Sequence, residues 1–205
     1  MAHNIASVKV KDSLYYYPMR GALGLNRRRK ADIAWVFSDT ANRNPMAIQT
    51  HPVLFSGTDP DPDIAAMRKV TAKEHVKLKR WKNIITAIAG GPVLVQRGSI
   101  AITNEQEMIF TGKAVNDKHP RTAMGYTRDG RLIILVVQGR AAGTAEGATL
   151  GQEARMLADI GCYEAVNLDG GGSSCMLVNG KETIRPSDKE GQRPIPAVFM
   201  IKRVK

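Results

Sequence analysis

Two arginines at strand ends are the residues of this chain best suited to bind an anion. Arg121 lies in the stretch HPRTAMGY and Arg140 follows LVVQG, and the two segments are joined by Asp129-Gly130, a dipeptide typical of tight hairpins. The outer ends of a hairpin lie side by side, so the two guanidinium groups are predicted to converge, as suits a phosphate with several oxygens. A pair of solvated surface arginines is the alternative. His119 is a weaker candidate, more typical of a structural or solvent-facing imidazole.

A glycine-rich turn follows an apolar run in NLDGGGSS, from Asn167 to Ser174. Two residues suffice for a tight turn, so three consecutive glycines, Gly170, Gly171 and Gly172, indicate a close approach to the backbone. Backbone N–H groups in such a turn can form an anion-binding concavity. Asp169 would repel a phosphate there, so it needs a role as general base, nucleophile, metal ligand or acceptor of a sugar hydroxyl. A plain hairpin turn is the simpler alternative.

The length and composition favour one domain, with residues 1–205 forming a mixed α and β protein. No apolar stretch approaches the roughly 20 residues of a membrane span, and the first residues lack the apolar core of a signal peptide. The chain as written is therefore expected to be cytoplasmic. Cys162 and Cys175 lack metal-binding spacing and are interpreted as buried free thiols rather than a disulfide.

A formal net charge of +11 predicts that the surface attracts anions. The charge is concentrated at Asn26 to Lys30, which reads as a turn, and at Met67 to Lys82. A solvated face is the simpler interpretation of both segments. Nucleic-acid binding is disfavoured because the basic segments lack interleaved aromatic residues and a recognisable binding motif. A phosphorylated sugar or an anionic glycan is the expected partner, and the oligomeric state is left open.

The first half of the chain is expected to contain a hairpin, a loop and a helix. Ala22 to Ser38 reads as two strands joined by a basic turn, and Thr50 to Asp63 as loop because it holds three prolines and a glycine. Asp61 or Asp63 is expected to cap a helix that runs toward Ile88 and is broken where its middle is basic. Its apolar positions would be Ile64, Met67, Trp81, Ile84, Ile85 and Ile88.

The second half is expected to be strand-rich. Gly90 to Ile102 reads as two strands around an Arg97-Gly98 turn, and Thr122 to Gly139 as the Asp129-Gly130 hairpin. A helix begins at Thr149, which has capping-box spacing to Gln152, and ends near Gly161; the strand YEAVNL follows. The predicted fold class is α+β: a curved, mixed or antiparallel sheet flanked by a few helices in a single domain.

Four segments in this order carry a resemblance to a known family: GGPVLVQRG, HPRTAMGYTRDGRLIILVVQGR, TLGQEARMLADIGCYEAVNLDGGGSS and RPSDKEGQRPIPAVFMI. They resemble the phosphodiester glycosidase family, which includes the vertebrate "uncovering enzyme" that removes N-acetylglucosamine from a sugar phosphodiester on lysosomal enzymes. The similarity extends from about Gly21 to Ile201. It implies a hydrolase that cleaves a sugar-1-phosphodiester at a polar site at the strand ends.

On the matching positions the resemblance implies a shared site. Its catalytic group would be Asp169, Arg121 and Arg140. The residues that bind substrate would be Thr122, Asn167, Gly170, Gly171, Gly172, Ser173, Ser174, Arg193 and His119. No cofactor is predicted, and a divalent cation is left open as one of the roles of Asp169. Cleavage of the C–O bond and cleavage of the P–O bond are both left open.

Three departures from the family pattern support a second hypothesis. The exported N-terminal part that family members usually carry, with an Asn-Gly-Gly-aromatic stretch, is expected to be missing here. Gln138 stands where the family motif has an acid, and Gln152 where the helix has a glutamate, although glutamine preserves the capping box. The alternative to the hydrolase is therefore a binding protein for an anionic or phosphorylated glycan that has lost turnover.

Overall fold

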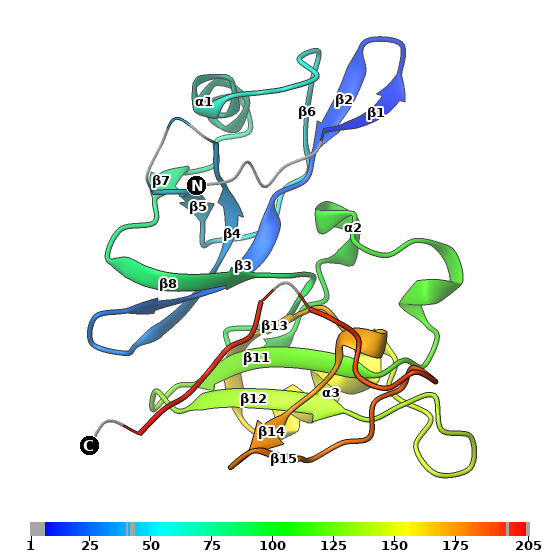
Figure 1. The fold of residues 1–205 in the computed structure, drawn as a ribbon. Coiled ribbons are helices and arrows are strands. Elements are labelled where there is room, and N and C mark those ends of the chain that lie inside the picture. Colours follow the sequence, from blue (N-terminus) through cyan, green and yellow to red (C-terminus); the bar gives the residue numbers. More distant parts are fainter. Residues whose placement is uncertain (1–6, 40, 42–43, 196, 204–205) are drawn as a thin grey trace.

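The computed structural model describes residues 7–39, 41, 44–195 and 197–203. Two five-stranded sheets lie one above the other, and all strand pairs among these residues are antiparallel (Figure 1). Three α-helices accompany them. The α+β class predicted from the sequence is confirmed, whereas the assignment of residues 1–205 to a single domain stays a prediction.

The upper sheet is built by the first half of the chain in the order β7-β5-β4-β3-β8. A smaller sheet, β1-β2-β6, and helix α1 adjoin it at the top of Figure 1. The elements are β1 (Val8–Lys11), β2 (Leu14–Tyr17), β3 (Arg20–Asn26), β4 (Ala31–Phe37), β5 (Met46–Ile48), β6 (Phe55–Gly57), α1 (Ile64–Lys73), β7 (Lys79–Arg80) and β8 (Ile84–Ala89).

The lower sheet is built by the second half of the chain in the order β10-β9-β13-β11-β12. Its elements are β9 (Val93–Gln96), β10 (Ser99–Ile100), β11 (Arg121–Thr127), β12 (Leu132–Val137) and β13 (Cys162–Asn167), with α2 (Asn104–Glu107) and α3 (Leu150–Asp159) beside them. Two 3₁₀ turns, Gly112–Val115 and Gly171–Ser173, and the short hairpin of β14 (Leu177–Val178) and β15 (Lys181–Glu182) complete the described elements.

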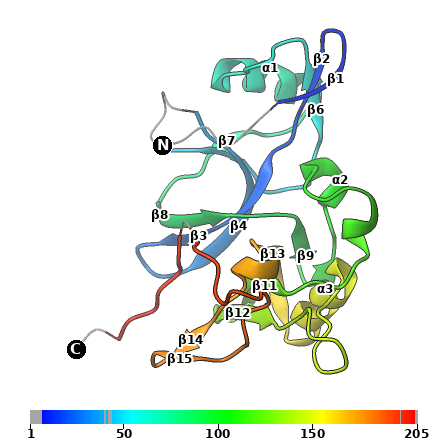
Figure 2. The same ribbon diagram turned by 45° about the vertical axis from the view of Figure 1, so that its right-hand side comes forward.

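The lower sheet is buried on both faces. Met124 and Val166 point into the core between the two sheets, while their neighbours Ala123 and Ala165 point into a second core against α3. Alternating side chains of a strand face opposite sides, so each strand contributes to both cores. The resulting layers are sheet, sheet and helix, and Figure 2 shows α3 on the side of the lower sheet away from β3 and β4.

Helix α3 begins and ends as its sequence predicts. The Thr149 hydroxyl accepts a hydrogen bond from Gln152 N at 3.1 Å, and Gln152 Oε1 accepts one from Thr149 N at 3.0 Å. Gly161 follows the last turn with φ +92°, a conformation that glycine adopts without strain. The capping box therefore survives the replacement of the glutamate that the family pattern has at position 152.

The three predicted hairpins are confirmed. The strands β3 and β4, β9 and β10, and β11 and β12 pair as expected. The turn glycines Gly98 and Gly130 have φ +82° and +90°. Cys162 and Cys175 are free thiols, but only Cys162 is buried. No helix in the described part of the chain is long and apolar enough to span a membrane.

The prediction of a helix running toward Ile88 is wrong beyond the first three turns. Asp63 caps α1 by accepting from Ala66 N at 2.7 Å, and the helix ends at Lys73. Residues 84–89 form strand β8 instead, because successive β-branched residues favour an extended backbone. The expected apolar positions Ile64 and Met67 are buried, whereas Ile85 is 62% exposed.

Two further details of that prediction differ from the structure. Trp81 is buried, but it lies directly after β7 and before the turn at 82–83 rather than on a helix. The segment from Thr50 to Asp63, predicted to be loop, contains the short strand β6, which pairs with β2. Pairing with a distant strand orders these three residues, which local turn signals do not reveal.

A buried carboxylate joins the two sheets. Glu107, at the end of α2, is fully buried and accepts hydrogen bonds from Gly21 N of β3 at 2.7 Å and Val93 N of β9 at 2.7 Å. It also accepts from the Trp35 indole N–H at 3.0 Å and the Thr103 hydroxyl at 2.5 Å. Burial raises the pKa of Glu107, and these donors oppose that rise.

Replacing Glu107 by glutamine is expected to destabilise the protein by about 2 kcal/mol or more, because the new amide group turns N–H bonds toward buried N–H donors. Urea unfolding measures the difference. The control is Glu105→Gln, an exposed position in the same helix. Equal unfolding free energies for the two variants would show that the four-donor site does not stabilise the fold.

Candidate functional site

The candidate site is a hollow of about 410 Å³ where strands of the lower sheet end. Arg121 opens β11, opposite Val137 at the end of β12, and Ala123 pairs with Asn167 at the end of β13. The antiparallel register therefore brings the ends of three strands to one edge. The predicted residues that line the hollow are His119, Arg121, Arg140, Asn167, Asp169, Gly170, Gly171, Gly172 and Arg193.

Three predicted site residues are not part of the lining: Thr122, Ser173 and Ser174. The Thr122 hydroxyl donates to the hydroxyl oxygen of Ser174 at 3.1 Å, and Ser174 is 2% exposed. Ser173 N donates to the Gly170 carbonyl at 3.1 Å and closes the glycine turn. In this structure these residues hold the turn against β11.

Arg121 is held rigidly by the backbone around it. It is 3% exposed, its Nε donates to the Ala148 carbonyl at 2.9 Å, and an Nη2 hydrogen goes to the Asp117 carbonyl at 3.1 Å. Its guanidinium carbon lies 5.5 Å from the centre of the Phe110 ring. The cation is therefore positioned before any ligand enters, which reduces the ordering cost of binding.

Arg140 is positioned by a constrained loop at the other side of the hollow. Its backbone has φ +60°, and it follows Gly139, where an added Cβ would lie 2.7 Å from Pro120 N. The Arg140 Nη1 lies 3.3 Å from Asp188 Oδ1, and the other oxygen of Asp188 lies 2.9 Å from Arg193 Nη2. Asp188 thus bridges two arginines that line the hollow.

Asp188 is a residue that the sequence reasoning missed. It lies in RPSDKEGQRP, where two acids, Asp188 and Glu190, stand among basic and turn residues, and this cluster of charges was the available signal. The segment is anchored by Gln138, whose Oε1 accepts from Arg185 N at 2.8 Å. Gln138, which stands where the family pattern has an acid, therefore fixes the segment that carries Asp188 and Arg193.

The three glycines are required mainly by contacts within the protein. A Cβ on Gly170 would lie 2.8 Å from the Pro120 carbonyl oxygen, and a Cβ on Gly172 would clash with the Asp188 carboxylate. Gly171 has φ +60°, which disfavours any side chain. The surplus of glycine does reflect close approach to the backbone, but the approaching groups belong to the chain itself.

The backbone N–H groups of the turn are only partly available to a ligand. Gly171 N donates to the Pro120 carbonyl at 2.8 Å, so it cannot contribute to an anion cradle. Among the described residues, Gly170 N and Gly172 N have no hydrogen-bond acceptor. The predicted concavity of three glycine N–H groups is thus reduced to two candidates.

Asn167 presents an unsatisfied acceptor at the hollow. Its Nδ2 donates to the Gly91 carbonyl at 2.7 Å, which fixes the orientation of the amide. Its Oδ1 is buried and has no donor in the described part of the chain. A buried acceptor without a partner is costly, so a ligand hydroxyl would be stabilised there.

Asp169 and His119 differ in how they are held. Asp169 is exposed, lines the hollow and has no hydrogen-bond partner among the described side chains. His119 is half-buried, and its backbone N and O pair with Ala148 in an isolated bridge. Within the described residues, no group of three or more His, Cys, Asp or Glu side chains could hold a metal ion.

A second missed acid lies behind Arg121. Glu153 in α3 is fully buried, and neither of its carboxylate oxygens has a hydrogen-bond partner among the described residues. Burial raises the pKa of Glu153 to about 8, and the positive charge of Arg121 opposes that rise. Glu153 shares the inward face of the helix with Leu150 and Leu157, so its position in an apolar stripe was the available signal.

Glu153 predicts a pH dependence of stability. Because the pKa of Glu153 is about 8 in the folded protein and its ordinary value is 4.5, the folded state holds a proton that the unfolded chain releases between these values. The free energy of unfolding should therefore fall as the pH rises from about 5 to about 8. Glu153→Gln should lack this contribution, with a difference of up to about 1.4 kcal/mol per pH unit.

Urea unfolding of both proteins across this pH range measures the effect. Glu105→Gln, which removes an exposed carboxylate, should retain the slope of the wild type. Parallel profiles for wild type and Glu153→Gln would contradict a protonated Glu153 at neutral pH.

The layered antiparallel fold and the hollow lined by arginine and glycine place the protein among α+β proteins with a polar site at their strand ends. The chain belongs to the phosphodiester glycosidase family, which matches residues 23–202. The resemblance inferred from the four sequence segments is thus confirmed at the level of the family.

Curated relatives resemble part of the chain. The N-acetylglucosamine-1-phosphodiester alpha-N-acetylglucosaminidase of Bos taurus is 35% identical over 121 residues, which are 58% of this chain and 23% of that protein. The Homo sapiens enzyme of that name is 34% identical over 112 residues, 51% of this chain and 21% of the enzyme. The chain therefore spans less than a quarter of these relatives.

Solved structures resemble the fold. A Burkholderia pseudomallei protein is 17% identical, with a TM-score of 0.50, over 86% of this chain and 56% of that one. The zebrafish N-acetylglucosamine-1-phosphodiester alpha-N-acetylglucosaminidase catalytic domain is 21% identical, with a TM-score of 0.49, over 86% of this chain and 49% of that one.

Proposed function

We propose that the protein hydrolyses a sugar-1-phosphodiester in the hollow at the strand ends. The observation that carries this proposal is the presence of three arginines, Arg121, Arg140 and Arg193, beside the exposed carboxylate of Asp169 in one hollow. Membership of the phosphodiester glycosidase family supports the reaction class. The name of the curated Bos taurus relative points to N-acetylglucosamine as the sugar, and a glycan of the cell envelope is the other substrate class that we propose.

Each group has a role in this proposal that its surroundings allow. Arg121, fixed by two carbonyls, binds the phosphate and stabilises the charge that grows on its oxygens as the bond breaks. The free Oδ1 of Asn167 accepts a sugar hydroxyl. Asp169 acts as base or nucleophile, and Asp188 positions Arg140 and Arg193 rather than touching the reacting atoms.

The reaction adds water across one ester bond. Asp169, as base, takes a proton from water, and the water oxygen bonds to either the anomeric carbon or phosphorus. The bond between that atom and the bridging oxygen breaks at the same time. The products are the free sugar and a phosphomonoester in both cases. Hydrolysis in ¹⁸O-labelled water distinguishes the two, because C–O cleavage labels the sugar and P–O cleavage labels the phosphate.

A non-catalytic binding protein for a phosphorylated glycan is the second candidate. The observation that favours it is Gln138, which supplies no carboxylate and is engaged with Arg185 N. Ordinary glycosidases use two carboxylates, and Asp169 is the single acid that lines the hollow among the described residues.

Asp169→Asn separates the two candidates. The asparagine keeps the size of the side chain but cannot take a proton, so turnover of a chromogenic N-acetylglucosamine-1-phosphodiester should fall by about a hundredfold or more. The melting temperature should not change, because Asp169 is exposed and has no partner to lose.

Asp159→Asn, at the exposed end of α3, serves as the control and should keep full turnover. Retained turnover in Asp169→Asn would reject Asp169 as the catalytic group. A wild type that binds the diester without hydrolysing it would establish the binding protein instead.

A further inference from the structure

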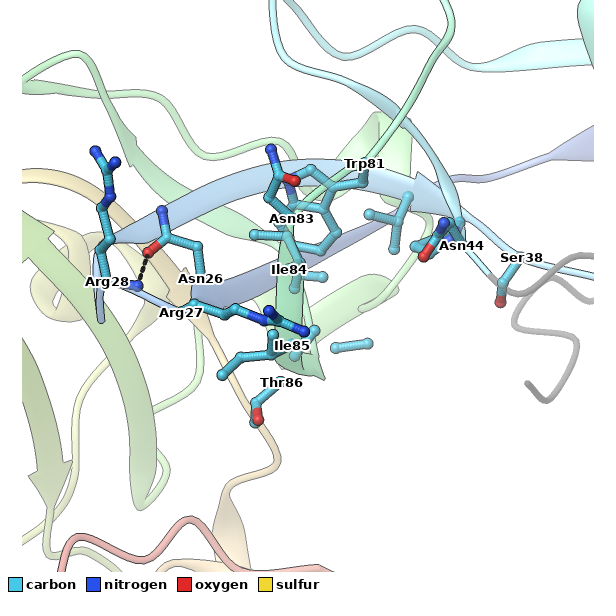
Figure 3. Close-up of a pocket in the computed structure, with 15 residues that line it drawn as sticks. Asn26, Arg27, Arg28, Ser38, Asn44, Trp81, Asn83, Ile84, Ile85 and Thr86 are labelled. Carbon is cyan, nitrogen blue, oxygen red and sulfur yellow. Dashed lines mark hydrogen bonds between the residues drawn. The ribbon is translucent and has the colours of Figure 1, made fainter.

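A second and larger hollow lies on the outer face of the upper sheet, away from the core. Its volume is about 1390 Å³, and it is lined by residues of β3, β4 and β8 and of the turns beside them. Figure 3 shows Arg28 at one end, Ser38 and Asn44 at the other, and Arg27 extended alongside Ile84 and Ile85. We refer to it as the β8 groove.

The cationic end of the groove is a well-ordered turn. The Asn26 side-chain oxygen accepts from Arg28 N at 2.8 Å and from Lys30 N at 3.1 Å, which stabilises the turn between β3 and β4. Among the described residues, Arg27 and Arg28 have no acid within ion-pair distance. Their charges are therefore available to an anion.

Asp32, an acid near the groove, already accepts hydrogen bonds within the protein. Asp32 of β4 accepts from the Trp81 indole N–H at 2.6 Å and from Gln49 Nε2 at 2.6 Å. It does not line the groove, so the lining contains arginines but no acidic residue. Charge complementarity therefore selects a negatively charged occupant.

The remaining lining suits a chain rich in hydroxyl groups. Amide side chains of Asn44 and Asn83 and the hydroxyl of Thr86 supply polar contacts along the groove. Between them lies the exposed surface of β8, where Ile85, 62% exposed, is followed by the small residues Ala87 and Ala89. Sugar rings present both apolar faces and hydroxyl groups, so they fit small apolar patches that are flanked by amide groups. A protein partner with an uninterrupted apolar surface fits such a lining less well.

The groove and the candidate site are lined by consecutive residues of the chain. Ala89, the last residue of β8, lines the groove, and the next residues, Gly90 and Gly91, line the hollow with Arg121. From Ile84 to Ala89 the strand rises by about 17 Å. A single sugar phosphodiester cannot span that distance, whereas a chain of several sugar units can.

We infer that the β8 groove binds the remainder of a polymeric anionic glycan whose sugar-1-phosphodiester lies in the hollow. This inference rests on the proposed function and specifies its substrate as a chain rather than a small diester. Arg27 and Arg28 act as the distal anchor, while the chemistry takes place at the other end of β8. Neither arginine touches the reacting bond.

The test compares long and short anionic glycans. The probes are oligogalacturonates of two and eight residues, which carry carboxylates and no phosphodiester, so binding can be measured without turnover. The variant Arg27→Gln/Arg28→Gln is compared with Lys9→Gln/Lys11→Gln, which removes the same charge from the exposed strand β1. Calorimetry gives the affinities, and the chromogenic diester gives the turnover.

The octamer is expected to bind the wild type at least about tenfold more tightly than the dimer, and the arginine variant should lose that advantage. Turnover of the small diester should stay within about twofold of the wild type in both variants. Arginine-dependent octamer binding by a protein that does not hydrolyse the diester would support the groove and reject the proposed catalysis.

Three results would overturn the inference. The octamer and dimer could bind the wild type equally, the arginine variant could bind the octamer as the wild type does, or the lysine variant could lose as much affinity as the arginine variant. Equal competition by a single-stranded DNA octamer would assign the groove to nucleic acid instead.

Discussion

The contact on which the arrangement depends is the carboxylate of Glu107 between the two sheets. Backbone N–H groups of β3 and β9 and the indole of Trp35 converge on it, so one side chain sets the separation of two sheets that come from different halves of the chain. Water cannot replace it, because the site is fully buried. A charged group in a core is costly unless several donors surround it, which makes this geometry specific.

Near Glu107, the segment from Ala89 to Gly91 contributes to the lining of both hollows. Gly90 N donates to Gly21 O and Gly91 N donates to Asn167 O, so the segment after β8 is fixed to the upper sheet by one residue and to the lower sheet by the next. The strand-end hollow is thus defined by the relation between the sheets and not by the lower sheet alone. A change in their separation would alter the position of Gly91 relative to Arg121.

The sequence was informative where local signals decide the structure. Hairpin turns with glycine, the capping box of α3 and the position of Arg121 and Arg140 at one hollow follow from short-range rules and antiparallel register. It was misleading at residues 84–89, where an amphipathic spacing suggested a helix and pairing with β3 imposed a strand. Asp188 and Glu153 could not be assigned to the site, because their positions depend on how a distant segment folds back and which face of α3 is buried.

The bridge from Arg140 through Asp188 to Arg193 means that two arginines lining the hollow already share an internal anion, which itself does not line the hollow. An anionic ligand would either displace Asp188 from the two arginines or bind beside it. Its affinity would therefore reflect the difference between its own ion pairs and those that Asp188 already makes. Weak monovalent anions gain little from such an exchange. If the site binds a phosphodiester as proposed, this arrangement would favour ligands able to engage both guanidinium groups at once.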